Sequence, residues 1–268
     1  MNILILGDVM GASGRKALIS KLPELIKKNK IDFVIVNGEN ASDDGRGITE
    51  EIAVQFFKTG VDVITSGNHI WDKKETTEFI DKENRLLRPA NLVSGSPGKG
   101  YKIFFSKNKK HKVGVINLMG NVFMRKTEDA FKTAKEICNK MKLKKDVDFL
   151  VVDFHGEITS EKMAVGHFFD GYATCVVGTH THVPTADTRI LDGGTAYQTD
   201  IGMCGDYNSV IGMNKENSIK RFLKEKDAIS HFPAEGEGTI SGVIVETNLE
   251  TGLAKKITRL IYGGSLVN

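Results

Sequence analysis

Short runs of apolar and β-branched residues, each followed by a glycine or a polar residue, recur between residues 2 and 182. Between these runs lie segments whose apolar residues have the spacing of an amphipathic helix. Continuous apolar runs are typical of strands covered on both faces, and a repeated order of strand and helix predicts parallel β-α-β units. The predicted strands cover residues 2–8, 32–40, 61–69, 113–120, 148–157 and 174–182, and the predicted helices cover residues 15–29, 49–58, 73–81, 127–141 and 160–169.

The pattern changes after residue 182, where three further strands are predicted with few helices between them, over residues 195–202, 239–248 and 255–264. The tetrapeptide LETG between the last two is typical of a hairpin turn. We therefore expect an α/β protein with a first, largely parallel sheet and a second, mostly antiparallel sheet packed on it. Because no linker rich in Pro, Gly or Ser divides the chain, we expect residues 1–268 to form a single domain.

Composition excludes several classes of protein. The 37 Lys and Arg nearly balance the 34 Asp and Glu, so charge does not indicate a nucleic-acid wrapper or a membrane-surface protein. The apolar start is short and lacks a basic leader, so it predicts a strand rather than a signal peptide, and we expect no transmembrane segment. Three scattered cysteines favour neither a disulfide framework nor a zinc knuckle, and a cytoplasmic location fits best.

Polar residues that could bind a metal follow most of the early strands. Because the carboxyl ends of strands in an open parallel sheet meet at one edge, we expect these side chains to converge on one crevice. On a strand, two histidines one residue apart would also point to the same side. The residues concerned are Asp8, Glu39, Asn40, Asn68, His69, His155, His180 and His182.

Each of these residues also has an ordinary structural explanation. Asp8 could cap a helix, Asn40 and Asn68 could be turn residues, and a single His155 is more often a hydrogen-bonded core histidine than a ligand. Two histidines in an H-x-H motif are, by themselves, more often a polar loop after a strand. The joint occurrence of only carboxylate, carboxamide and imidazole groups at successive strand ends favours a site.

The chemistry that requires this mixture of ligands is hydrolysis with two metal ions. Two divalent ions about 3.5–4 Å apart can hold a phosphoryl group and activate a water. A carboxylate shared between the ions offsets their repulsion, and a mixed oxygen and nitrogen set suits Mn, Fe or Zn better than Ca or Mg. A structural tetrahedral zinc is not indicated, because the set contains no cysteine.

Three other kinds of site are not supported by the sequence. The glycines at positions 7, 11 and 14 do not form G-x-G-x-x-G, and Asp8 would place a negative charge where a pyrophosphate should bind. The chain contains neither the pentapeptide G-x-S-x-G nor a P-loop G-x-x-x-x-G-K-[ST].

At these residues the chain resembles the calcineurin-like metallophosphoesterases. The matching blocks, in order, are Gly7-Asp8, the GNH of residues 67–69, His155 and the GTHTH of residues 178–182. Two blocks depart from the usual pattern, because the D-x-H opening reads Asp8-Val9-Met10 and Glu39 stands where the bridging aspartate is usual. These departures are typical of a narrower group, the YmdB-like metallophosphoesterases, which the chain also resembles in GDVMG, VNGENAS, TSGNHIWDKKE, RPAN, DFHGEITSEK, VVGTHTHVPTADTRIL and GGTAYQTDIGM.

The resemblance implies an αββα sandwich and phosphodiesterase activity toward 2′,3′-cyclic nucleotides through a dinuclear centre and a metal-activated water. It implies two divalent or mixed-valence ions, with Fe or Mn favoured and Zn compatible. His69 would protonate the leaving oxygen or stabilise the charge on the phosphoryl group. The first ion would take Asp8, Glu39, Asn40 and His182, and the second would share Glu39 and take Asn68, His155 and His180.

Some alternatives stay open at this point. The same centre could serve a phosphomonoesterase or a nuclease, or the chain could be a regulatory or RNA-associated metalloprotein with incidental turnover. The expected partner is a small nucleotide phosphodiester, and the sequence does not decide on RNA association or homo-oligomer formation. Glu157 and Asp187 could fix an imidazole tautomer or form surface ion pairs, and Cys204 is interpreted as a packing residue.

Overall fold

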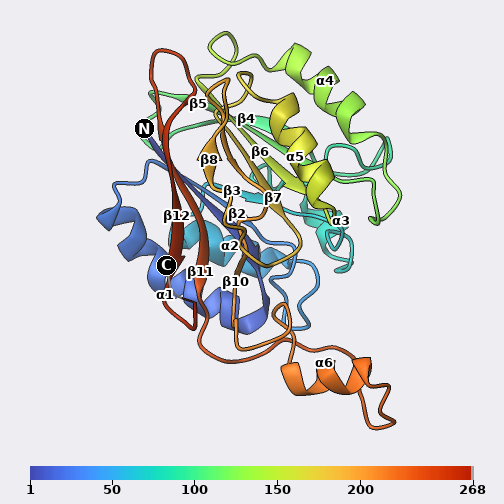
Figure 1. The fold of residues 1–268 in the computed structure, drawn as a ribbon. Coiled ribbons are helices and arrows are strands. Elements are labelled where there is room, and N and C mark those ends of the chain that lie inside the picture. The colour runs from blue at the N-terminus through green and yellow to red at the C-terminus, as the bar shows by residue number, and fades with distance from the viewer. Residues whose placement is uncertain (267–268) are drawn as a thin grey trace.

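The computed structural model describes residues 1–266, which form two packed β-sheets with helices on both outer sides (Figure 1). The expected α/β class with two sheets flanked by helices is confirmed. The helices are α1 (Gly11–Lys28), α2 (Glu50–Thr59), α3 (Thr76–Phe79), α4 (Ala130–Lys140), α5 (Thr159–Phe168) and α6 (Lys215–Phe222).

The first sheet has a parallel part and an antiparallel part. Its strands, in spatial order, are β12 (Ala254–Tyr262), β11 (Ile240–Thr247), β1 (Asn2–Val9), β2 (Phe33–Asn37) and β3 (Val63–Thr65), with β10 (Met203–Cys204) paired to the end of β1. The pairings of β1 with β2, β2 with β3 and β1 with β10 are parallel. β11 lies antiparallel to β1 and forms a hairpin with β12, as the LETG turn predicts.

The second sheet has parallel strands in its centre and an antiparallel strand at each edge. In spatial order it contains β4 (Tyr101–Phe105), β5 (Lys112–Met119), β6 (Phe149–His155), β7 (Cys175–Thr179), β9 (Ala196–Gln198) and β8 (Arg189–Ile190). Only the pairings of β4 with β5 and of β8 with β9 are antiparallel in this sheet, within residues 1–266.

The expected division of strands between the sheets is therefore wrong in detail. The parallel strands are split between both sheets, and the late strands β11 and β12 extend the first sheet instead of forming a second one. The predicted helix over residues 73–81 is reduced to the single turn of α3, because hydrogen-bonded turns occupy the residues before it. Strand β4 and helix α6 were not predicted from the sequence.

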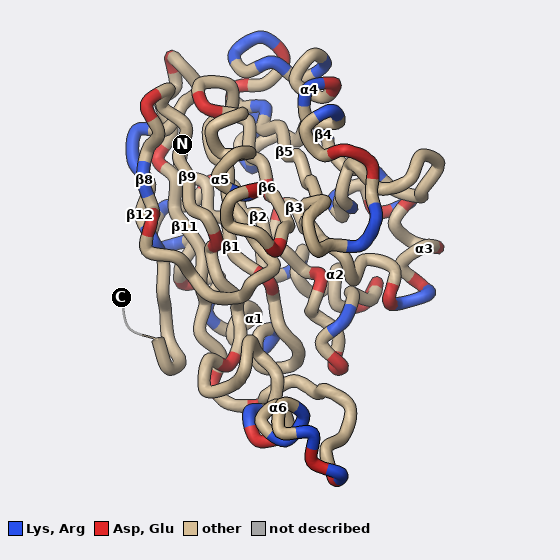
Figure 2. Tube along the Cα trace, turned by 45° about the vertical axis from the view of Figure 1, so that its right-hand side comes forward, with Lys and Arg blue, Asp and Glu red and all other residues tan. Residues whose placement is uncertain are grey.

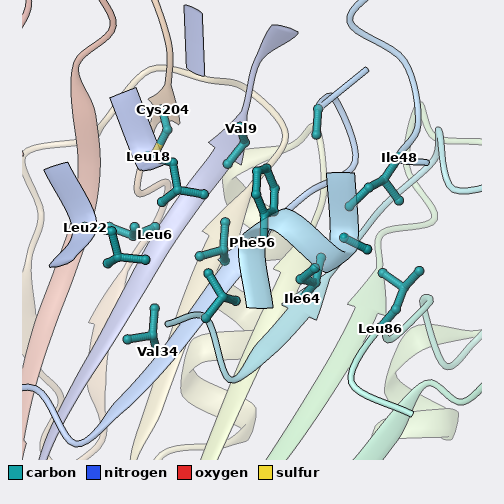
Figure 3. Close-up of a cluster of buried hydrophobic side chains, with 14 of the residues drawn as sticks. Leu6, Val9, Leu18, Leu22, Val34, Ile48, Phe56, Ile64, Leu86 and Cys204 are labelled. Carbon is teal, nitrogen blue, oxygen red and sulfur yellow. The ribbon is translucent and has the colours of Figure 1, made fainter. Parts of the chain in front are cut away.

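Alternation along the strands builds three hydrophobic layers. In β1, Ile3 and Ile5 face the second sheet, whereas Leu4 and Leu6 face the outer helices. Leu18 and Leu22 of α1 and Phe56 of α2 cover this outer face (Figure 3). A third layer lies between the second sheet and helices α4 and α5. Full burial of both faces explains why the strands read as continuous apolar runs.

The layered arrangement places the carboxyl ends of parallel strands from both sheets close together. Helix α6 is capped by the side chain of Asn214 and lies in a segment that projects away from the layers (Figure 1). Charged segments of both signs are interspersed along the chain, including on α6 (Figure 2). No helix within residues 1–266 combines the length and apolar character needed to cross a membrane.

Candidate metal centre

The structure brings the predicted polar residues together where the parallel strands of the two sheets end. Asp8 belongs to β1, and Glu39 and Asn40 follow β2. Asn68 and His69 follow β3, and His155 is the last residue of β6. The expected convergence therefore occurs between two sheets rather than at the edge of one.

His155 is the hub of the cluster. Its Nε2 lies 3.1 Å from Glu39 Oε1, 3.0 Å from Asn68 Oδ1 and 3.1 Å from His180 Nδ1. A single ring nitrogen can donate only one hydrogen bond, so this convergence of acceptors exceeds what one N–H can satisfy. Such an excess of lone pairs is stabilised by a cation at their centre.

Neighbouring groups fix the tautomers of the two histidines. Thr179 donates its hydroxyl hydrogen to Asp153 and so accepts from His155 Nδ1, at 2.9 Å. Glu157 Oε2 lies 3.0 Å from His180 Nε2 and can accept only from an N–H there. In the neutral form of each ring, the nitrogen that faces the centre is then unprotonated, which is the form that binds a metal. Glu157 thus has the orienting role that the sequence left open.

Two further acceptor atoms, one from His182 and one from Asn40, face each other. His182 Nδ1 lies 2.8 Å from the carbonyl oxygen of Ile211, so this nitrogen carries the hydrogen and Nε2 carries a lone pair. Asn40 donates its amide to the carbonyl of Gly45, so its Oδ1 is the atom 3.2 Å from His182 Nε2. Two lone pairs at this distance repel unless a cation lies between them.

Asp8 supplies a buried carboxylate oxygen without a hydrogen-bond partner. Its Oδ2 accepts from the backbone N–H of His180 at 3.1 Å, whereas Oδ1 has no hydrogen-bond partner among the described residues and lies 3.6 Å from His155 Nδ1. An unsatisfied buried carboxylate oxygen is destabilising in a protein interior, and a metal ion would satisfy it.

These observations fit metal binding. One ligand atom each from Glu39, His155 and His180 lies within 4.8 Å of the others. Gly67 leaves the space for this arrangement, since a Cβ there would lie 2.2 Å from His155 Cδ2 and 2.3 Å from Glu39 Oε2. The donor set of carboxylate, carboxamide and imidazole suits Mn, Fe or Zn.

The electrostatics of the cluster without metal show strong mutual influence. Burial raises the pKa of Asp8 to about 6, although His182 and His155 act in the opposite direction. Burial alone would raise the pKa of Glu39, but His155 lowers it to about 2. Burial disfavours the charged form of His155, yet Glu39 and Asp8 raise its pKa to about 9. Burial and the neighbouring His155 lower the pKa of His180 to about 3.

The two histidines of the H-x-H motif do not lie on a strand. Strand β7 ends at Thr179, and both His180 and His182 have positive φ, 95° and 65° respectively. The expectation that strand alternation points them to one side is therefore wrong. They lie in a turn of uncommon backbone conformation that directs His180 to His155 and His182 to Asn40.

His69 lies at the edge of the cluster and is partly exposed. Its backbone N–H donates to Glu39 Oε2, at 3.1 Å, and its Nδ1 lies 2.7 Å from Asp72 Oδ2. Asp72 also accepts from the guanidinium of Arg125. Because a carboxylate holds Nδ1, the opposite nitrogen of His69 is left for another partner.

Sequence reasoning missed the residues that support the cluster. Asp72 stands only three residues after His69, which was the available signal. Buried Asp153 accepts from Asn37, Thr65 and Thr179, and burial raises its pKa. Lys162 and Asp200 form a buried ion pair.

Two residues whose roles the sequence left undecided, Asp187 and Cys204, have structural roles. Asp187 accepts from Thr185, Thr199 and Arg189 and contacts no imidazole among the described residues. Cys204 is buried in the outer core layer, as its interpretation as a packing residue predicts.

Comparison with known proteins extends these observations. A family model described as YmdB-like protein matches residues 4–260. The chain is 46% identical over 261 residues to a Bacillus subtilis (strain 168) protein named 2′,3′-cyclic-nucleotide 2′-phosphodiesterase, with 97% of each chain covered. Among solved structures, a hypothetical protein of Thermus thermophilus is 35% identical with a TM-score of 0.89, covering 98% of this chain and 99% of that one. A structure described as a novel phosphatase of Mycoplasma pneumoniae is 37% identical with a TM-score of 0.88, covering 98% and 94%.

Proposed function

The chain belongs to the YmdB-like protein family, and from this premise we propose that it is a metal-dependent phosphodiesterase that hydrolyses 2′,3′-cyclic nucleotides. The similarity to the Bacillus subtilis phosphodiesterase extends over 97% of both chains, so the match is not confined to one part of either protein. The reaction class is hydrolysis of a phosphoric ester.

One observation carries the proposal: three other ligand-type atoms surround a single nitrogen of buried His155. A purely structural histidine needs one partner at that nitrogen. The arrangement is the one expected where a cation is bound, and it lies at the strand ends where ligands of such folds bind.

We assign the ligands as two sets that share Glu39. Asp8, Asn40 and His182 would complete the first set, whereas Asn68, His155 and His180 would complete the second. Asn40 takes the place of a histidine ligand that Met10 cannot supply. When bound, the two ions would withdraw charge from the phosphoryl oxygens and lower the pKa of a water. We favour Fe or Mn, including a mixed-valence pair, with Zn compatible.

His69 is assigned as the proton donor to the leaving oxygen. The carboxylate of Asp72 holds Nδ1 and so fixes the ring with Nε2 directed elsewhere. Arg125 contacts the same carboxylate and limits its movement. His69 is partly exposed and so accessible to a substrate, whereas His155 is fully buried.

The proposal is tested by assaying purified protein with Mn²⁺ on 2′,3′-cAMP, bis-p-nitrophenyl phosphate and p-nitrophenyl phosphate. We expect hydrolysis of both diesters, little hydrolysis of the monoester and loss of all activity after chelation. Preference for p-nitrophenyl phosphate would contradict the assignment and indicate a phosphomonoesterase.

Variants then test whether the cluster is responsible. Glu39→Gln should abolish turnover and reduce the metal content, whereas the exposed control Glu250→Gln should change neither. A cellular effect that survives in Glu39→Gln would favour the regulatory alternative. Association with RNA or with a second copy, and a cytoplasmic location, stay predictions.

A further inference from the structure

The loop formed by residues 121–128 starts next to the end of β6 and contacts the carboxylate that holds His69. At its start, the backbone N–H of Gly120 donates to the carbonyl oxygen of His155 at 2.9 Å. Near its end, Arg125 donates to Asp72, the carboxylate that holds His69. The chain between Gly120 and Arg125 therefore runs from the backbone at the end of β6 to the carboxylate that orients His69.

Hydrogen bonds also close the base of this loop. Asn121 donates its amide to Thr127 Oγ1 at 2.8 Å and to the carbonyl of Glu128 at 3.0 Å. Its side-chain oxygen accepts from the backbone N–H of Ala130, and its backbone N–H donates to Glu161. The tip of the loop thus projects from a fixed base rather than from a loose connection.

Phe123 lies at this tip. It is three residues from Gly120 and two from Arg125, so its Cα lies within roughly 11 Å of the first and roughly 7 Å of the second. The side chain is 84% exposed. Its φ of 58° lies in the left-handed region, which is uncommon for a bulky residue.

Exposure alone would carry no meaning, because single apolar residues on a surface are ordinary. Phe222 is 81% exposed, but it belongs to the regular helix α6, which stands away from the layers that build the centre. Phe123 combines an uncommon backbone conformation with a place in a closed loop, two residues from the Arg125 that contacts Asp72. The contact of Arg125 with Asp72, the carboxylate that holds His69, connects this loop to the candidate centre.

We propose that Phe123 forms the nucleobase subsite, stacking on the base of the nucleotide whose cyclic phosphate lies at the metal centre. This inference rests on the proposed function. Stacking tolerates any base because each has a π face, but a purine offers the larger face, so adenine should bind better than cytosine. The loop would then select nucleotides over other cyclic phosphates.

The test compares Phe123→Ala and Phe123→Tyr with the wild type on three cyclic phosphates: 2′,3′-cAMP, 2′,3′-cCMP and glycerol 1,2-cyclic phosphate, which has no base. For Phe123→Ala we expect KM for 2′,3′-cAMP to rise about tenfold, which lies within the roughly 5- to 150-fold range that stacking on one base is worth. The rise should be smaller for 2′,3′-cCMP and absent for the glycerol compound, with kcat unchanged throughout. Phe123→Tyr should restore the wild-type KM.

The control is Phe222→Ala, which removes an equally exposed phenyl group from α6 and should leave all three KM values unchanged. An unchanged KM for 2′,3′-cAMP in Phe123→Ala would overturn the subsite while leaving the phosphodiesterase assignment intact. An equal rise for the base-free compound would also overturn it, because the loop would then act on the phosphate. If the wild type hydrolysed none of the three, the proposed function itself would fail.

Discussion

Lys162 Nζ lies 2.7 Å from Asp200 Oδ2 in a buried ion pair that joins α5 to the segment after β9. The same carboxylate oxygen accepts from the backbone N–H and the hydroxyl of Thr181, at 3.1 and 2.7 Å. Thr181 separates His180 from His182, whose backbones both have positive φ. The ion pair therefore holds the turn that presents both histidines to the candidate metal centre.

Replacement of Lys162 by Met should destabilise the protein strongly. The change leaves the Asp200 carboxylate buried without its cationic partner, and breaking a buried pair in this way costs about 3–5 kcal/mol. Urea unfolding followed by circular dichroism measures the change in the free energy of unfolding. Because the turn is released as well, the metal content should also fall.

The control is Lys144→Met, which removes the partly exposed ion pair with Asp148. An exposed pair contributes about 0–1 kcal/mol, so this variant should unfold almost like the wild type. Equal losses in the free energy of unfolding for the two variants would contradict the argument that the burial of the Lys162 ion pair causes the larger loss.

The strand ends could be predicted from the sequence because each early strand is a continuous apolar run with a sharp polar end. The pairing of the strands could not. Antiparallel β11 adds to β1 through contacts between residues more than two hundred positions apart, such as Leu4 with Ile244. Hydrophobic pattern specifies which face of a strand is buried but not which neighbour it chooses.

The candidate ligands could be predicted for the same reason, since they follow strand ends at a recognisable spacing. Their supports could not, because Lys162 and Asp200 are ordinary charged residues in the sequence and meet only after folding. Asp72 is the exception, because it stands three residues after His69 and the local turn after Asn68 brings the two together. The pairing of Lys162 with Asp200, by contrast, depends on tertiary structure, which one sequence does not display.

Replacement of His69 by Ala should lower kcat while leaving the metal in place. A positioned general acid contributes a factor of roughly 10²–10⁴, and His69 is not among the proposed ligands. Steady-state kinetics on 2′,3′-cAMP, together with metal analysis, separates an effect on kcat from an effect on metal binding.

Asp72→Asn should give a smaller loss of kcat, because the His69 ring loses its orienting charge but keeps a hydrogen-bond acceptor. The exposed His167→Ala serves as control, and a similar loss there would contradict a specific role for His69.

Replacement of Gly67 by Ala should prevent assembly of the centre. The added Cβ would lie 2.2 Å from His155 Cδ2 and 2.3 Å from Glu39 Oε2, and both side chains are too buried to move aside. We expect loss of bound metal and of diesterase activity in a protein that still folds.

The control is Gly95→Ala, where the Cβ meets nothing within 4 Å but φ is +86°. That variant should lose about 1–2 kcal/mol of stability and no activity. Normal metal content in Gly67→Ala would contradict the packing argument.

Removal of the metal should lower the stability of the protein, and the return of Mn²⁺ should restore that stability only if Glu39 is present. A ligand that binds only the folded state adds about 2.7 kcal/mol at a concentration a hundred times its Kd. The chelated wild type should therefore unfold at a lower temperature and recover when Mn²⁺ is returned. Without metal, the lone pairs of Asn40 and His182 face each other, and Asp8 Oδ1 has no hydrogen-bond donor among the described residues. Glu39→Gln should show no recovery with Mn²⁺, because the shared ligand between the two proposed ion sites is lost. Differential scanning fluorimetry over a Mn²⁺ titration measures this, with Glu250→Gln as the matched control. Equal recovery in both variants would mean that Mn²⁺ binds elsewhere on the chain.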